Sequence, residues 1–381
     1  MNNHFVFGCF LVTIFFQTVT CASLDIEERK KQFCVLNFEG AASRPCQGIM
    51  LNNIAKQVGD NLLKKFDLVA GISAGAGLAV YLTATNPDGS NIYTPEELTE
   101  AIPNLIKASA VTSWYHKLTT LWGLIGPRYS NASFREISKK DLGDSRLSQT
   151  SIPIIVPVID FHTKKIVILS TLKARENPEH DCFLRDVVGG AVAIPAIAPP
   201  YRIRFFQKDG SPGGKSMLAT DAALYFYSPA VFALQEAKKL CFDGNIRMLD
   251  VGSGALENWF IDPVIPNATK EPRIPQQGLL QVLPSLASTI LRGLMFSSDE
   301  CIKAFFGGKL NSHYFCLQVL LKKKKGHKNP YILDDFDPRV HKDLRLQTEE
   351  YMQTEEYKQT LRNFFGPDLL KNAQSQIRAK L

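Results

Sequence analysis

The pentapeptide Gly71-Ile72-Ser73-Ala74-Gly75 has residue types and spacing typical of nucleophilic chemistry. It matches the pattern G-x-S-x-G and follows a short apolar run, so a strand is expected to pass there directly into a helix. Such a sharp turn exposes the serine hydroxyl, and Gly71 and Gly75 leave room for the crossing backbone. A second interpretation stays open, in which Ser73 only caps the helix.

A serine nucleophile needs a base that takes its proton and donors that hold the resulting oxyanion. The loop Glu39–Arg44 is rich in small residues and precedes a helix, so its backbone N–H groups are candidate donors. Asp221 lies at the expected end of a strand and is the candidate base. The alternative is a Ser-His-Asp esterase that uses His313 or His341, although neither histidine lies in a local motif.

Strands and helices alternate around these residues. Strands are expected at Phe33–Asn37 and Asp67–Ala70, and helices are expected from Gly48 onward and at Ala74–Thr85, which is apolar on all sides. This alternation predicts an α/β fold of three layers, with a mostly parallel sheet covered by helices on both faces. Further elements are expected at Pro153–Asp160, Lys165–Ser170 and Arg247–Val251 (strands) and at Pro229–Leu240 (helix).

The chain changes character after about residue 255. Longer helices are expected at Gly278–Leu294 and Glu349–Phe364, with a strand at Tyr314–Leu321. We therefore expect a catalytic domain at residues 30–255 and a mainly helical C-terminal region, residues 256–381, packed on the same domain.

Five sequence blocks in order resemble the patatin-like phospholipase family, whose members are lipid acyl hydrolases with a Ser-Asp dyad. The family's oxyanion loop D-G-G-G-x-R-G is similar to Glu39–Arg44 with Gly48 after a short insertion, and its G-x-S-x-G is similar to Gly71–Gly75. The remaining blocks are similar to Gly189–Pro195, to Asp221-Ala222-Ala223 with Ser228-Pro229, and to Val251–Gly254.

The resemblance implies a role for each matching residue. Ser73 would attack a fatty acyl ester and Asp221 would accept its proton, with no metal and no organic cofactor. The oxyanion hole would be formed by the backbone N–H groups of Gly40, Ala41, Ala42 and Ala74, and the motif also includes Gly71, Gly75 and Arg44. The substrate class implied is a membrane lipid or phospholipid.

Alanine replaces glycine at three positions of these blocks: Ala41, Ala42 and Ala222. Alanine in a conformation with positive φ is strained by about 1 kcal/mol or more, so the substitutions would displace a loop that requires that conformation. A second function therefore stays open, that of a catalytically impaired relative that binds lipids or membranes.

The 381 residues carry 44 Lys and Arg against 37 Asp and Glu, a net charge of +7 without the dense basic stripe of a nucleic-acid binder. With the run Lys322–Lys325, this charge favours an anionic membrane surface as partner. The apolar run Phe5–Phe16, followed by small residues at Thr20-Cys21-Ala22, predicts a cleavable signal peptide at residues 1–22. A secreted or periplasmic protein is expected.

Overall fold

The computed structural model describes residues 32–40, 45–59, 62–109, 119–120, 126–241, 244–256, 279–322 and 337–367. The predicted signal peptide, residues 1–22, lies outside these ranges. So do Ala41, Ala42 and Arg44 of the predicted oxyanion loop, and all of the predicted lysine run except Lys322.

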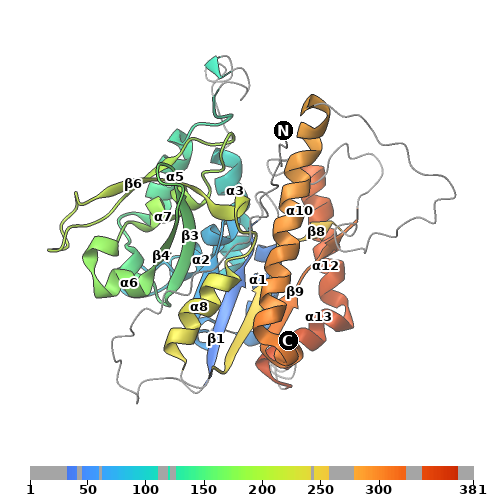
Figure 1. The fold of residues 1–381 in the computed structure, drawn as a ribbon. Helices are drawn as coiled ribbons and strands as arrows, with labels where there is room; N and C mark the ends of the chain where they lie inside the picture. Colours follow the sequence, from blue (N-terminus) through green and yellow to red (C-terminus); the bar gives the residue numbers. More distant parts are fainter. Residues whose placement is uncertain are drawn as a thin grey trace, which may run out of the picture.

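The centre of the fold is an eight-stranded mixed sheet with the order β5-β6-β3-β2-β1-β7-β9, in which β4 also pairs with β3 (Figure 1). Five neighbouring strands, β3, β2, β1, β7 and β9, are parallel, whereas β4 and β6 run antiparallel to β3 and β5 runs antiparallel to β6. The strands are β1 Phe33–Phe38, β2 Leu68–Gly71, β3 Ile154–Asp160, β4 Ile166–Ser170, β5 Tyr201–Arg204, β6 Ser216–Asp221, β7 Ile246–Val251 and β9 Tyr314–Leu317. A separate parallel pair joins β8 (Ala255–Leu256) and β10 (Leu320–Leu321).

Helices cover both faces of this sheet. The helices are α1 Cys46–Val58, α2 Ala74–Thr83, α3 Pro95–Ser109, α5 Ala132–Leu142, α6 Thr171–Glu176, α7 Leu184–Ala191, α8 Ala230–Leu240, α10 Leu279–Phe306, α11 Leu310–His313, α12 Pro338–Gln353 and α13 Glu355–Phe365. Short 3₁₀ turns lie at η2 Leu63–Lys65, η4 Leu147–Gln149, η5 Pro178–His180, η6 Ala222–Leu224 and η7 Gly307–Lys309.

The alternation of side chains along β1 explains the two cores. Phe33 and Val35 pack with α8 and the end of α10, which cross the front of the sheet in Figure 1. Leu36 and Phe38 point to the opposite face, where α1, α2, α7, α12 and α13 form the larger core. The three-layer α/β fold expected from the sequence is therefore confirmed. Every residue of α2 is buried, as its apolar sequence requires.

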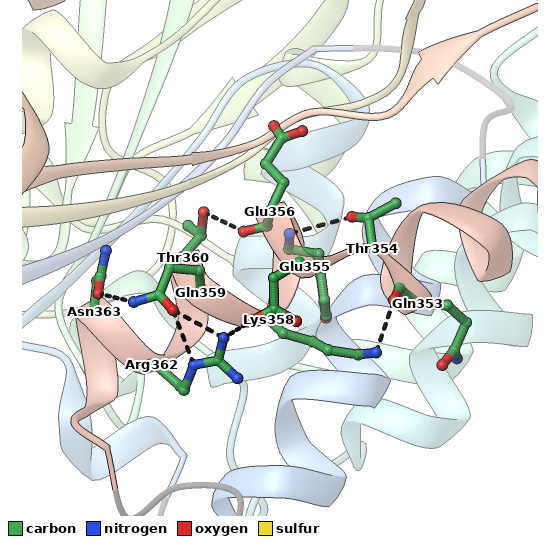
Figure 2. Close-up of polar contacts among 10 residues, drawn as sticks. Gln353, Thr354, Glu355, Glu356, Lys358, Gln359, Thr360, Arg362 and Asn363 are labelled. Atoms are coloured by element: carbon green, nitrogen blue, oxygen red, sulfur yellow. Dashed lines mark hydrogen bonds and ion pairs between the residues drawn. The ribbon is translucent and has the colours of Figure 1, made fainter.

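The C-terminal region differs from the sequence-based expectation in three ways. The strand expected at Tyr314–Leu321 is two strands, β9 and β10, which belong to different sheets. Helix α10 continues to Phe306, beyond the expected end at Leu294. The single helix expected at Glu349–Phe364 is two helices, because Thr354 is extended (φ −66°, ψ 152°) and its hydroxyl accepts a hydrogen bond from the Tyr357 amide, which caps α13. Figure 2 shows polar contacts around this break, where the Lys358 ammonium donates to the Gln353 carbonyl at the end of α12.

The C-terminal region also completes the central sheet, since β9 pairs with β7 in parallel. Within the described ranges, no helix combines the length and the apolar character needed to cross a bilayer.

Candidate active site

Ser73 lies on a sharp turn between a central strand and a buried helix. Strand β2 ends at Gly71 and α2 begins at Ala74, so only two residues connect them. Ser73 has φ 55° and ψ −127°, a conformation that is strained by about 1 kcal/mol or more for a residue with a side chain. Its side chain forms no capping hydrogen bond with α2. The interpretation of Ser73 as a mere helix cap is therefore wrong.

The two flanking glycines are required by close backbone contacts. A Cβ atom on Gly71 would lie 2.3 Å from the carbonyl oxygen of Gly75. A Cβ atom on Gly75 would lie 2.5 Å from the carbonyl oxygens of both Phe38 and Glu39. Both distances are far below van der Waals contact. Gly71 is therefore required where the end of β2 meets the first turn of α2, and Gly75 is required where that turn packs against the end of β1.

The Ser73 hydroxyl donates a hydrogen bond of 2.6 Å to Oδ2 of Asp221. The other carboxylate oxygen, Oδ1, accepts a hydrogen bond of 2.8 Å from the Ala223 amide. Asp221 is fully buried, and burial raises the pKa of its carboxyl group to about 7 against the lowering effect of these two hydrogen bonds. A carboxylate with this pKa accepts protons far better than an ordinary aspartate does, while half of it is ionised near neutral pH.

Backbone contacts with β3 and with Ala193 fix the position of Asp221. Asp221 ends β6, where it pairs with Val158 of β3, and its amide donates to the carbonyl oxygen of Ala193. Ala222 is buried with a φ that is not positive, so alanine causes no backbone strain at this position. The strain expected from alanine in place of glycine is therefore absent at Ala222.

Gly40 lies directly against the dyad. A Cβ atom on Gly40 would be 3.3 Å from the Cβ atoms of both Ser73 and Ala223. Its amide, however, donates to the Tyr227 carbonyl oxygen at 3.2 Å. The structure differs here from the sequence-based expectation of Gly40 as an oxyanion donor, because a long-range contact with the segment after η6 already uses this N–H group.

The Ala74 amide is the expected donor that remains available among the described residues. Ala74 is the first residue of α2, and none of the described hydrogen bonds uses its N–H group. The helix dipole places partial positive charge at this end of α2, next to Ser73. The expected contributions of Ala41, Ala42 and Arg44 fall outside the described residues.

Among the residues that the structure describes, no histidine forms a hydrogen bond with the dyad: the hydrogen bonds of Ser73 and Asp221 join them to each other, to Ala223 and to backbone groups. His313 directly precedes β9, and the order β2-β1-β7-β9 places that strand three positions from β2. At about 4.8 Å per strand, this separation is roughly 14 Å. The fold therefore gives no support to the esterase alternative with His313 as the base.

The buried polar groups beside Gly40 were not identified from the sequence. Tyr227 and Ser253 join their hydroxyl groups at 2.7 Å, and Glu39 accepts a hydrogen bond from the Ser253 amide. Glu39 and Ser253 lie in blocks that were recognised in the sequence, whereas Tyr227 lies in no recognised motif. Within the described ranges, no group of three or more His, Cys, Asp and Glu side chains is arranged to hold a metal ion.

Comparisons with known proteins identify the family to which the sequence is similar. A family model described as Patatin-like phospholipase matches residues 40–232, a range that contains Gly40, Ser73 and Asp221. Patatin-like protein 4 of Arabidopsis thaliana is 27% identical over 180 residues, which are 44% of this chain and 44% of that protein. Patatin-like protein 1 of the same plant is 26% identical over 227 residues, 56% of this chain and 54% of that protein. The chain thus spans about half the length of the curated relatives it matches.

Among solved structures, VipD from Legionella pneumophila matches with a TM-score of 0.36 and 10% identity, covering 85% of this chain and 67% of that chain. A likeness this low carries no argument about function.

Proposed function

Because the chain belongs to the patatin-like phospholipase family, we propose that it is a serine acyl hydrolase that cleaves fatty acyl esters of membrane glycerolipids. The observation that carries the proposal is the 2.6 Å hydrogen bond from the Ser73 hydroxyl to Asp221. It joins a nucleophile on a strained turn to a buried carboxylate whose pKa is raised to about 7. Such a pair performs acyl transfer.

In the first half of the reaction, Ser73 Oγ attacks the ester carbonyl carbon while Asp221 Oδ2 takes the hydroxyl proton. The negative charge that develops on the carbonyl oxygen is stabilised by the Ala74 amide and the N-terminus of α2. The C–O bond to the lipid alcohol then breaks, and Asp221 returns the proton to the departing oxygen. An acyl ester on Ser73 remains.

Water completes the cycle by the same route. Asp221 accepts a proton from the attacking water, which adds to the acyl carbon. The bond to Ser73 Oγ breaks, the proton returns to Oγ, and the fatty acid leaves. One buried base therefore serves both half-reactions, which is possible because its pKa lies near the working pH.

The test is fatty acid release from vesicles of phosphatidylcholine and phosphatidylglycerol. The wild-type protein is expected to release fatty acid and Ser73→Ala is expected to release none. Ser138→Ala is the matched control, since Ser138 is also a fully buried serine but lies on α5, where its hydroxyl bonds to the Arg135 carbonyl. Undiminished release by Ser73→Ala would remove the proposal.

The lipid-binding relative without activity is the second candidate. The observation that favours it is the Gly40 amide, which is already hydrogen-bonded to Tyr227. Wild-type protein that binds vesicles but releases no fatty acid from any ester tested would support this candidate over the hydrolase.

The surface and location of action are further proposals. The net charge of +7 and the run Lys322–Lys325 favour an anionic membrane, at about 1 kcal/mol per lysine near the surface. Vesicle sedimentation at low and high salt tests this, and binding that is equal with and without phosphatidylglycerol would contradict it. Secretion with cleavage after Ala22 is tested by the N-terminal sequence of exported protein.

A further inference from the structure

Gly40 is held from both sides by two residues that belong to other parts of the fold. Its amide donates to the backbone carbonyl of Tyr227 at 3.2 Å. Its carbonyl oxygen accepts a hydrogen bond of 3.4 Å from the Ser253 hydroxyl. The two holding residues also contact each other, because the Tyr227 hydroxyl lies 2.7 Å from Ser253 Oγ.

The protons in this ring can be assigned from its connectivity. A serine hydroxyl has one proton, so Ser253 Oγ donates it to the Gly40 carbonyl and accepts the proton of the Tyr227 hydroxyl. Three hydrogen bonds thus form a closed path. The Gly40 amide donates to the Tyr227 carbonyl, the Ser253 hydroxyl donates to the Gly40 carbonyl, and the Tyr227 hydroxyl donates to Ser253 Oγ. Tyr227 and Ser253 are 6% and 1% exposed, so these bonds are shielded from competing water.

Ser253 is itself fixed by Glu39, the residue next to Gly40. The Ser253 amide donates to Glu39 Oε2 at 3.2 Å, and the Gln318 side-chain amide donates to the same oxygen at 3.4 Å. Burial, followed by the nearby Asp250, raises the pKa of Glu39 well above its usual range.

We propose that Tyr227 and Ser253 are positioning residues, which fix the Gly40 peptide against the Ser73 nucleophile. The inference rests on the proposed acyl hydrolase function. The Gly40 amide and the Gly40 carbonyl oxygen belong to the two peptide groups on either side of its Cα, so hydrogen bonds to both of them restrict rotation of the Gly40 backbone. Gly40 lies so close to Ser73 that an added Cβ atom would be 3.3 Å from the serine Cβ atom, so a more mobile Gly40 backbone changes the surroundings of the developing oxyanion.

Tyr227→Phe tests this by removing one hydroxyl while the ring is kept. We expect kcat to fall about tenfold with KM within about twofold of the wild-type value. The pH midpoint of kcat should stay near 7, because the contacts of Asp221 are unchanged. The matched control is Tyr357→Phe, which also removes the hydroxyl of a buried tyrosine. Tyr357 lies in α13, and its hydroxyl donates to Asn53 Oδ1 at 2.9 Å rather than to any residue beside Gly40. The kcat of this control variant should match the wild type.

Ser253→Ala breaks the same path at its second residue. The double variant with Tyr227→Phe should lose no more than about twofold beyond the worse single variant, since both changes interrupt one path. The inference is overturned if Tyr227→Phe keeps the wild-type kcat, if the Tyr357→Phe control loses as much, or if the two single losses multiply in the double variant.

Labelling of Ser73 by a fluorophosphonate separates this inference from the proposed function. A wild-type protein that is labelled but hydrolyses no lipid contradicts the lipid hydrolase, while slower labelling of Tyr227→Phe than of Tyr357→Phe still supports the positioning role. Equal labelling rates in those two variants contradict the positioning role, whatever the lipid result. If the wild-type protein is neither labelled nor active, both the acyl hydrolase function and the positioning role are contradicted.

Discussion

The Ser73 hydroxyl donates a 2.6 Å hydrogen bond to Asp221, a residue 148 positions later in the chain. The acceptor is fully buried, and the donor is 4% exposed on a turn with positive φ. The pair is thus a proton donor and a proton acceptor in direct contact, with no imidazole between them. This arrangement predicts how activity and stability respond to substitution and to pH.

Asp221→Asn should lower kcat by roughly 10²- to 10⁴-fold, because asparagine keeps the shape of the side chain but cannot accept the serine proton. His313→Ala and His341→Ala should stay within about tenfold of wild type. The measurement is fatty acid release by variants whose circular dichroism matches that of the wild type. A collapse of turnover in either histidine variant would transfer the role of base to that histidine.

The activity should depend on the ionisation of Asp221. Only the carboxylate accepts a proton, so a pKa of about 7 predicts that kcat/KM rises about tenfold per pH unit below 7 and reaches a plateau above about 8. Initial rates from pH 5 to 9 check this in buffers of constant ionic strength. A midpoint near 4, the usual range of an aspartate, would show that burial does not shift the pKa as the structure indicates.

Asp221→Asn should also make the protein more stable at neutral and alkaline pH. A carboxyl group whose pKa is raised by folding binds its proton more tightly in the folded state, so its contribution to the free energy of unfolding decreases as the pH rises from about 4 to 7. From 3.8 to about 7, the decrease amounts to about 4 kcal/mol, which asparagine avoids.

Urea unfolding of wild type and Asp221→Asn at pH 5 and pH 8 measures this effect. The stability advantage of Asp221→Asn over the wild type should be larger at pH 8 than at pH 5 by roughly 2 to 3 kcal/mol, because about a third of the loss is already complete at pH 5. Contributions from the other buried acids, Glu39 and Asp250, are common to both proteins and cancel in the comparison. A difference that is the same at both pH values would mean that the Asp221 carboxyl is not buried in solution.

Gly75→Ala should destabilise the protein by about 3 kcal/mol or more, since the added Cβ would meet two backbone carbonyl oxygens at 2.5 Å. Gly293→Ala is the matched control in α10, where a Cβ meets nothing within 4 Å and alanine should raise the free energy of unfolding by up to about 1 kcal/mol. Thermal unfolding of both variants and of the wild type measures these changes in stability. Equal stability of the two would show that α2 and β1 are less closely packed than the structure has them.

Local patterns in the sequence were sufficient to predict most of the elements around the dyad. The apolar run before Gly71 and the uninterrupted apolar run after it correspond to β2 and α2, because strand and helix periodicities are local properties. The break at Thr354 was missed, since apolar periodicity continues on both sides of it and only the capping bond to Tyr357 ends one helix and begins the next.

By itself, the sequence determined that Ser73 lies on a tight strand-to-helix turn and that Asp221 ends a strand, since spacing and residue type are sufficient for both. Only the tertiary structure decided that these two side chains meet at 2.6 Å, that burial raises the pKa of Asp221, and that the Gly40 amide is held by Tyr227 rather than left open to an oxyanion. The physical reason is that strand order and burial join segments more than a hundred residues apart, and no local pattern encodes which polar groups are brought together there.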